Sequence, residues 1–192
     1  MRLFVALDID EEIKQRLDDY VRTLQPRLPG VRFVRSNTYH VTLKFLGERH
    51  EADGIMVALH ELRQRQFSIS FRNVGFFPNE RAPRVFWAGI EAPPALAELA
   101  RGVNQSLERL GFVPEHEFHP HLTLARNGSG RRQPVRGERS PEAFAQLARI
   151  VASSLMPEFG TMTAREFFLY ESKLSATGPS YTKLARFELA ST

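Results

Sequence analysis

Two copies of a short His-x-Thr motif are the residues of this chain best suited to carry out chemistry. The first copy is His40-Val41-Thr42 and the second is His121-Leu122-Thr123, and each continues with a leucine. Successive side chains of a β-strand point to opposite faces, so the histidine and the threonine of each copy share one face. Each copy therefore presents an imidazole and a hydroxyl side by side.

Two imidazoles in one site can divide the work of acid–base catalysis. The reference pKa of histidine is about 6.5, so one ring can be neutral while the other is protonated near pH 7. The neutral ring can take a proton from water and the charged ring can protonate a leaving oxygen, each role being worth roughly 10² to 10⁴ in rate.

Hydroxyl groups and a guanidinium suit the oxygens of a phosphate. Thr42 and Thr123 supply the hydroxyls, and Arg126 stands three residues after Thr123. Strict alternation points Arg126 away from Thr123, so the arginine can take part only if the strand bends there or if its long side chain reaches around the edge of the strand.

Other histidines precede the second copy of the motif. His119 shares a face with His121 if the strand is already extended at that point, and only the match to the first copy singles out His121. His116, His119 and His121 could alternatively be zinc ligands. The first copy has no such cluster and no further ligand stands at a recognisable spacing, so we predict a site without metal or cofactor.

Three aromatic residues are candidates for stacking on a nucleobase: Phe45, Trp87 and Tyr181. We favour core packing for Phe45 and Trp87, whereas Tyr181 follows Gly178 and Pro179 and is expected at the surface. Residues 127–139 contain three glycines and four arginines. This segment is interpreted as a solvated loop, and a clamp on a substrate strand is the alternative.

Hydrophobic spacing gives the expected elements that position these residues. Strands are expected at residues 3–9, 67–71, 85–90, 162–170 and 182–189 and at both motifs, and helices at 13–24, 55–62, 96–110 and 141–155, with Ser140 as an N-cap and Gly111 as a C′ glycine. The order strand, helix, motif strand, helix, strand occurs twice. Its offsets agree, being 82 positions from Leu3 to Val85 and 81 from His40 to His121.

This repeat predicts two units, each with two helices, that pack as pseudo-symmetric lobes. Residues 1–192 would form a single domain, with repeats at approximately 1–80 and 81–192 joined between Phe77 and Arg84. The C-terminal strand could pair across the lobes. Both motif strands would face one central cleft, because sites commonly form where lobes meet.

Composition limits the class of protein further. The chain has 192 residues, 42% of them hydrophobic and 25% charged, a net charge of +4 and no cysteine. Disulfides, thiolate metal sites and a cysteine nucleophile are excluded, which suits a cytoplasmic protein. No apolar run approaches the ~18 residues that span a bilayer, and the N-terminal apolar stretch is too short for a signal peptide.

These motifs resemble the two-histidine phosphoesterase superfamily, and within it the RNA 2′,3′-cyclic phosphodiesterases, also called 2′-5′ RNA ligase-like proteins. The resemblance rests on residues 40–47 and 118–126, on the start at 2–7 and on the segment 178–181. It implies a bilobal α+β enzyme in which each lobe has an antiparallel-rich sheet and two helices, with a metal-independent site in the central cleft. Such an enzyme opens the 2′,3′-cyclic phosphate at an RNA end to leave a 2′-phosphate.

The resemblance also implies roles for individual residues. His40 would donate a proton to the leaving 3′ oxygen and His121 would accept one from water, with Thr42, Thr123 and Arg126 on the phosphate. His119 departs from the pattern, and a charge on it would disfavour a charge on His121.

Other functions remain open at the level of sequence. The main reaction could be 2′-5′ RNA ligation or hydrolysis of a small cyclic nucleotide, or the chain could be a non-catalytic module that binds RNA ends. In each case the expected partner is an RNA end or a nucleotide with a 2′,3′-cyclic phosphate. We expect no membrane partner and a monomer.

Overall fold

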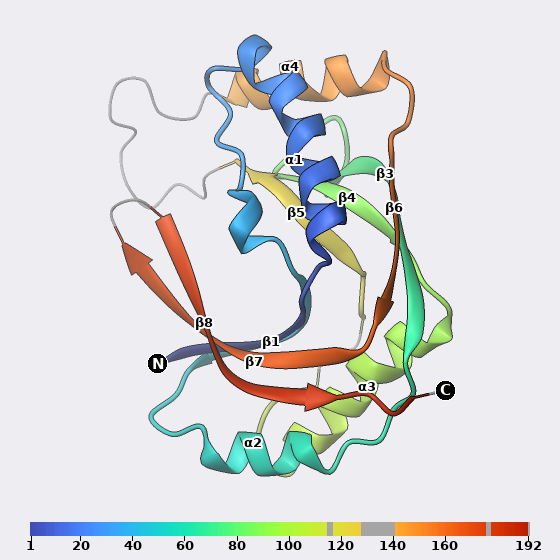
Figure 1. Ribbon diagram of the computed structural model, residues 1–192. Helices are drawn as coiled ribbons and strands as arrows, with labels where there is room; N and C mark the ends of the chain where they lie inside the picture. Colours follow the sequence, from blue (N-terminus) through green and yellow to red (C-terminus); the bar gives the residue numbers. More distant parts are fainter. Residues whose placement is uncertain (115–116, 128–140, 176–177, 192) are drawn as a thin grey trace.

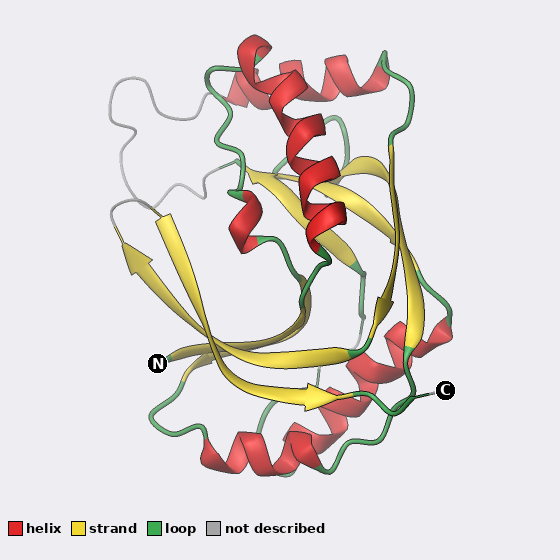
Figure 2. Cartoon of the chain, viewed as in Figure 1, coloured by secondary structure: helices red, strands yellow, loops and turns green. Residues whose placement is uncertain are grey.

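The computed structural model describes residues 1–114, 117–127, 141–175 and 178–191, and within these ranges two antiparallel sheets carry the motifs (Figures 1 and 2). The first sheet has the strand order β2-β1-β7-β8 and the second has the order β5-β4-β3-β6. The strands of the first sheet are β1 (Arg2–Leu7), β2 (Val41–Glu48), β7 (Glu166–Ser175) and β8 (Gly178–Glu188). Those of the second are β3 (Phe67–Phe77), β4 (Val85–Glu91), β5 (His121–Arg126) and β6 (Glu158–Ala164). The predicted α+β class is confirmed.

Helices cover one face of each sheet (Figure 1). The helices are α1 (Glu11–Leu24), α2 (Asp53–His60), α3 (Pro94–Glu108) and α4 (Pro141–Ala152). Helices α2 and α3 lie against the first sheet, while α1 contacts β6 and α4 packs on the second sheet through Phe144 and Phe76. Helix α1 thus follows a strand of the first sheet but covers the second, and α3 does the reverse.

Each sheet also takes strands from both halves of the sequence. Strand β3 pairs with β4 and β6 in the second sheet, and β7 pairs with β1 in the first. The order strand, helix, motif strand, helix, strand is present twice, and the strands β7 and β8 follow it. The sheets therefore do not coincide with the stretches 1–80 and 81–192.

Several expected elements have different bounds in the structure; β8, for example, begins at Gly178 instead of 182. The strand expected at 162–170 is two strands, because β6 ends at Ala164 and β7 begins at Glu166. Strand β3 runs beyond 71 to Phe77; a register shift and a positive φ of 60° at Asn73 interrupt its alternation. The helix expected to reach 155 ends at Ala152, and Leu155 is 95% exposed.

Local hydrogen bonds explain this early helix end. The hydroxyls of Ser153 and Ser154 both donate to the carbonyl oxygen of Ile150. These bonds satisfy one of the backbone carbonyls that have no partner within the helix at its C-terminal end. At the end of α3, Gly111 has a φ of +80°, as expected of a C′ glycine. Ser140 lies outside the described residues.

Strand β1 is buried on both faces and separates two apolar clusters. Leu3, Val5 and Leu7 belong to the main core under the helices. Phe4 and Ala6 point the other way and pack in a smaller cluster with Phe168 and Tyr170. This second cluster supports the face of the first sheet that bears the first motif. None of the described helices combines the length and the apolarity that crossing a membrane would need.

Candidate active site

The two motif strands are edge strands that meet each other. Strand β2 is at one edge of the first sheet, β5 is at one edge of the second, and the two strands are in contact. His40 lies directly before β2, and His121 is the first residue of β5. The fold thus brings together two motifs that are 81 residues apart in the sequence.

Both imidazoles are held by the same kind of hydrogen bond. Nδ1 of His40 lies 2.7 Å from the carbonyl oxygen of Thr38, and Nδ1 of His121 lies 2.8 Å from that of His119. A carbonyl only accepts, so Nδ1 carries the proton and donates it in both rings. Nε2 of a neutral ring is then free of a proton and can accept one. Because Nδ1 is hydrogen-bonded to a carbonyl oxygen in both rings, both would exchange protons through Nε2.

A β-bulge in each strand places a third side chain beside the threonine. Across β5, Trp87 pairs with Thr123 but Phe86 pairs with Ala125, which leaves Leu124 as the extra residue. Leu124 and Ala125 are both buried, and Arg126 returns to the face of Thr123. Its Nη2 donates to Oγ1 of Thr123 at 3.2 Å. This bulge is the bend that Arg126 required.

The bulge of β2 has the same position in its motif. Val5 pairs with Lys44 and Ala6 with Thr42, so Leu43 is the extra residue. Lys44 is consequently buried, and Phe45 emerges on the face of Thr42 with 61% of its surface exposed. Core packing is therefore the wrong interpretation of Phe45. In the second motif an arginine occupies the equivalent place.

Each of the two motif histidines contacts at least one aromatic ring. The His40 ring lies 4.9 Å from Phe4 and 5.2 Å from Tyr181, between ring centroids. The His121 ring lies 5.1 Å from Phe77, edge to face. Phe4 and Phe77 were not predicted as site residues, because an aromatic residue on a strand is equally typical of a core.

Desolvation and positive charge both disfavour the imidazolium form of the two rings. Burial lowers the pKa of His40, the hydrogen bond to Thr38 opposes this, and Arg126 lowers the pKa further. Burial also lowers the pKa of His121, against the hydrogen bond to His119, with Arg126 and the His119 side chain adding to the decrease. The expected effect of His119 on His121 is thus present. Arg126 acts on both rings, as a cation between the motifs would.

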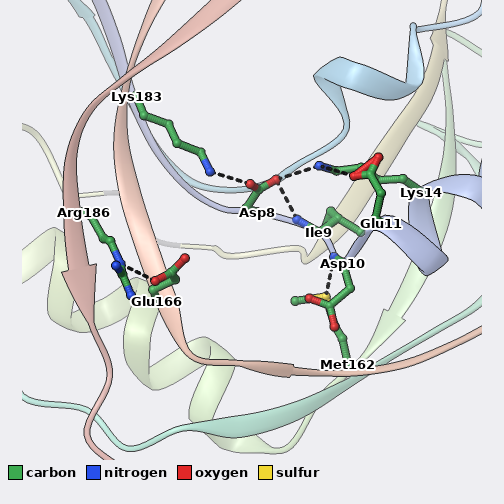
Figure 3. A network of polar contacts seen from close by, with 9 residues as sticks. All are labelled: Asp8, Ile9, Asp10, Glu11, Lys14, Met162, Glu166, Lys183 and Arg186. Atoms are coloured by element: carbon green, nitrogen blue, oxygen red, sulfur yellow. Dashed lines mark hydrogen bonds and ion pairs between the residues drawn. The ribbon is translucent and has the colours of Figure 1, made fainter.

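One acidic group distinguishes the surroundings of the two histidines. Asp8, directly after β1, accepts a hydrogen bond from Lys183 Nζ at 2.6 Å and from the backbone N–H of Ile9 at 2.9 Å (Figure 3). It also forms an ion pair with Lys14 at 3.2 Å. Asp8 raises the pKa of His40, which partly offsets the effect of Arg126. Its bond to Lys183 ties β1 to the strand that carries Tyr181.

Some sequence predictions fall beyond what the structure describes. His116 and the arginines at 131, 132, 136 and 139 lie outside the described residues, so the zinc alternative and the arginine clamp keep their status as hypotheses. Within the described ranges, no three histidine or acidic side chains are grouped as metal ligands would be. His119 is exposed and pairs with Glu117 at 3.2 Å.

Comparison with known proteins identifies the family. A sequence model of the family described as LigT-like phosphoesterase matches residues 7–87 and 90–181. The chain belongs to this family. A protein from Archaeoglobus fulgidus, named RNA 2′,3′-cyclic phosphodiesterase, is 37% identical to this LigT-like phosphoesterase, and the match covers 98% of this chain and 100% of the relative. A protein of the same name from Methanothermobacter thermautotrophicus is 34% identical, with 98% and 99% covered.

Solved structures agree with the sequence relatives. The structure of E. coli LigT complexed with 3′-AMP has a TM-score of 0.75 and 28% identity, covering 98% of this chain and 97% of that one. The structure of TT0787, a protein from Thermus thermophilus, has the same TM-score at 31% identity and 98% coverage of both chains. The resemblance inferred from the two motifs is therefore confirmed for nearly the whole length of this LigT-like phosphoesterase.

Proposed function

We propose that this LigT-like phosphoesterase hydrolyses 2′,3′-cyclic phosphate ends of RNA to 2′-phosphomonoesters, with His40 and His121 as the acid–base pair and without a metal ion. The observation that carries the proposal is the equivalent arrangement of the two rings, each fixed at Nδ1 by a backbone carbonyl. The name RNA 2′,3′-cyclic phosphodiesterase, shared by full-length relatives, supports the substrate.

The proposed reaction moves two protons. Nε2 of neutral His121 takes a proton from water as the water oxygen bonds to phosphorus. The bond from phosphorus to the 3′ oxygen breaks, and protonated His40 gives its proton to that oxygen. The phosphate stays on the 2′ oxygen. The resemblance to the family assigns the two roles. Asp8 raises the pKa of His40, which agrees with His40 as the proton donor.

Three groups would hold the phosphate during this step. The hydroxyls of Thr42 and Thr123 share the faces of the two histidines, and Arg126 is fixed beside Thr123. Negative charge develops on the phosphoryl oxygens as water attacks, and preorganised donors stabilise it in the transition state. Phe45 and Tyr181 lie on the His40 side, where they would stack on the base of the terminal nucleotide.

The test uses an oligonucleotide that ends in a 2′,3′-cyclic phosphate, with and without EDTA. His40→Ala and His121→Ala should each lower kcat by roughly 10² or more. His50→Ala, an exposed histidine outside the motifs, is the matched control and should retain activity. The product should carry a 2′-phosphate.

Several results would count against this function. Full activity in either motif variant would contradict the two-histidine mechanism, and loss of activity in EDTA would contradict the metal-free one. A product with a 3′-phosphate would contradict the direction of ring opening. Tight binding of the RNA end without turnover by the wild type would favour the binding-module alternative.

A further inference from the structure

A second aromatic surface lies beside His121, on the site-facing side of the second sheet. Trp87 pairs with Thr123 and Gly89 pairs with His121 across β4 and β5. Residues directly opposite each other in a ladder share a face, so Trp87 lies on the face of the motif. Its neighbours Phe86 and Ala88 point into the main core. Core packing is therefore the wrong interpretation of Trp87, which is half-buried on the other side.

Two glycines leave room for the indole of Trp87 over the sheet. A Cβ on Gly75, which pairs with Trp87 from β3, would stand 2.4 Å from Cζ2 and 2.5 Å from Cη2 of the indole. A Cβ on Gly89 would stand 3.4 Å from Cζ3. The indole ring therefore occupies space above β3 and β4 that side chains of these strands would otherwise fill.

Phe77 extends this surface towards the histidine. The ring centroids of Phe77 and Trp87 are 5.3 Å apart with an interplanar angle of 35°, and Phe77 also contacts His121. Phe77 is half-buried like Trp87. An aromatic surface thus continues from the His121 ring along β3 and β4.

We propose that Trp87 and Phe77 form a second nucleobase-binding surface, which takes the base of the nucleotide preceding the one with the cyclic phosphate. This inference rests on the proposed function. A cyclic mononucleotide has one base and can occupy one surface, on the His40 side with Phe45 and Tyr181 or on the His121 side with Trp87 and Phe77. Two surfaces that flank one phosphate site fit the last two nucleotides of an RNA strand.

The in-line geometry of the reaction indicates which base would lie on which surface. His40 protonates the 3′ oxygen of the terminal ribose, so the terminal nucleoside lies on the side of His40. Water attacks from the opposite side, next to His121. The surface of Trp87 and Phe77 is then left for the preceding base, and stacking there would favour RNA of two or more nucleotides whatever its sequence.

The chain offers a direct probe, because Trp87 is its single tryptophan. Fluorescence of the wild type is titrated with inorganic phosphate, adenosine 2′-phosphate and the dinucleotide ApA carrying a terminal 2′-phosphate. We expect the dinucleotide to quench Trp87 more strongly and to bind on the order of tenfold more tightly than the mononucleotide. Equal quenching and equal affinity for the two nucleotides would overturn the proposal.

Kinetics provide the second measurement. The ratio of kcat/KM for cyclic-phosphate-ended ApA over 2′,3′-cyclic AMP should fall on the order of tenfold in Trp87→Leu and in Phe77→Leu, and less in Trp87→Phe. Phe45→Leu is the matched control, which should lower both values and leave their ratio unchanged. An unchanged ratio in folded Trp87→Leu and Phe77→Leu would overturn the proposal.

The two proposals can fail separately. If the wild type hydrolyses neither cyclic substrate, the proposed function is wrong, while the fluorescence titration still decides whether a second base binds at Trp87. If both substrates are hydrolysed but the dinucleotide has no advantage in binding or turnover, only the second surface is wrong.

Discussion

Arg126 donates a hydrogen bond to Thr123 within the same strand, across a spacing of three residues that an even β-strand would place on opposite faces. The extra residue Leu124 reverses the alternation between them. The first motif has its extra residue at Leu43, so Phe45 occupies the place of Arg126. The same kind of β-bulge thus places a cation beside one motif and an exposed aromatic ring beside the other.

This contact predicts that Arg126 and Thr123 act as a unit. Arg126→Met and Thr123→Val should each lower kcat/KM, Arg126→Met by about 10² because it removes a charged donor from the phosphate. The double variant should lose less than the two single losses combined, since each single change already disturbs the pair. Thr42→Val, on the other motif strand, is the control: it is proposed to share only the phosphate with Arg126, so its cycle with Arg126→Met should depart less from additivity than the cycle of Thr123 and Arg126. Additivity in both cycles would contradict the coupling.

The lowered pKa values of both histidines predict an acidic activity optimum. Activity requires one protonated and one neutral ring, so a bell-shaped profile of kcat/KM is expected, and its alkaline limb should begin below the ordinary histidine pKa of about 6.5. The two limbs belong to the coupled pair, because His121 also affects His40. A maximum well above pH 7 would contradict this assignment.

Arg126→Met should move that profile towards higher pH. The arginine lowers the pKa of both rings, so its removal stabilises both imidazolium forms and raises both pKa values. The measurement is the pH dependence of the residual activity. Arg2→Met is a matched control, because Arg2 acts on Tyr181 and not on the histidines. A profile that does not move in Arg126→Met would place the arginine outside the site.

Buried Lys44 predicts a large effect on stability. It is 2% exposed, and its ammonium donates to Oδ1 of Asn104 at 2.5 Å and to the carbonyl of Val113 at 2.9 Å. Lys44→Met should reduce the free energy of unfolding by about 1–3 kcal/mol, because these buried acceptors lose a donor. Urea denaturation measures the loss. Lys183→Met removes an exposed ion pair with Asp8 and should cost under about 1 kcal/mol. Equal losses of unfolding free energy in Lys44→Met and Lys183→Met would contradict the prediction that burial makes the Lys44 hydrogen bonds more important for stability.

The position of the Trp87 indole over Gly75 predicts that a side chain at residue 75 destabilises the fold. Gly75→Ala should destabilise the fold by about 1–3 kcal/mol and shift the emission of Trp87, since the new methyl group overlaps the indole. Gly54→Ala in α2, where the new Cβ would stand 4.0 Å from the Leu110 side chain, should be neutral or slightly stabilising. Unchanged emission in Gly75→Ala would show that the indole does not rest on this strand.

The family and most of the elements were predictable from the order of the residues. The two His-x-Thr motifs predicted the histidines as a pair, because strand alternation is a local property of the backbone. The resemblance of these motifs and of the segments 2–7 and 178–181 to known proteins predicted the family and the α+β class. The helix α3 and its end near Gly111 were predictable because helical spacing and a C′ glycine are also local features of the sequence. Local patterns failed where alternation was interrupted, at Asn73 in β3 and in the boundary between β6 and β7.

What lies around each motif depends instead on the packing of the whole chain. Sequence spacing could not show that β3 pairs in the second sheet while β7 and β8 complete the first, because strand partners are chosen by contacts between distant segments. The bulges at Leu43 and Leu124 depend on neighbouring strands in the same way, and they decide where Phe45 and Arg126 point. Trp87 became a site-facing residue only through its partners Gly75 and Thr123, which come from strands on either side of it.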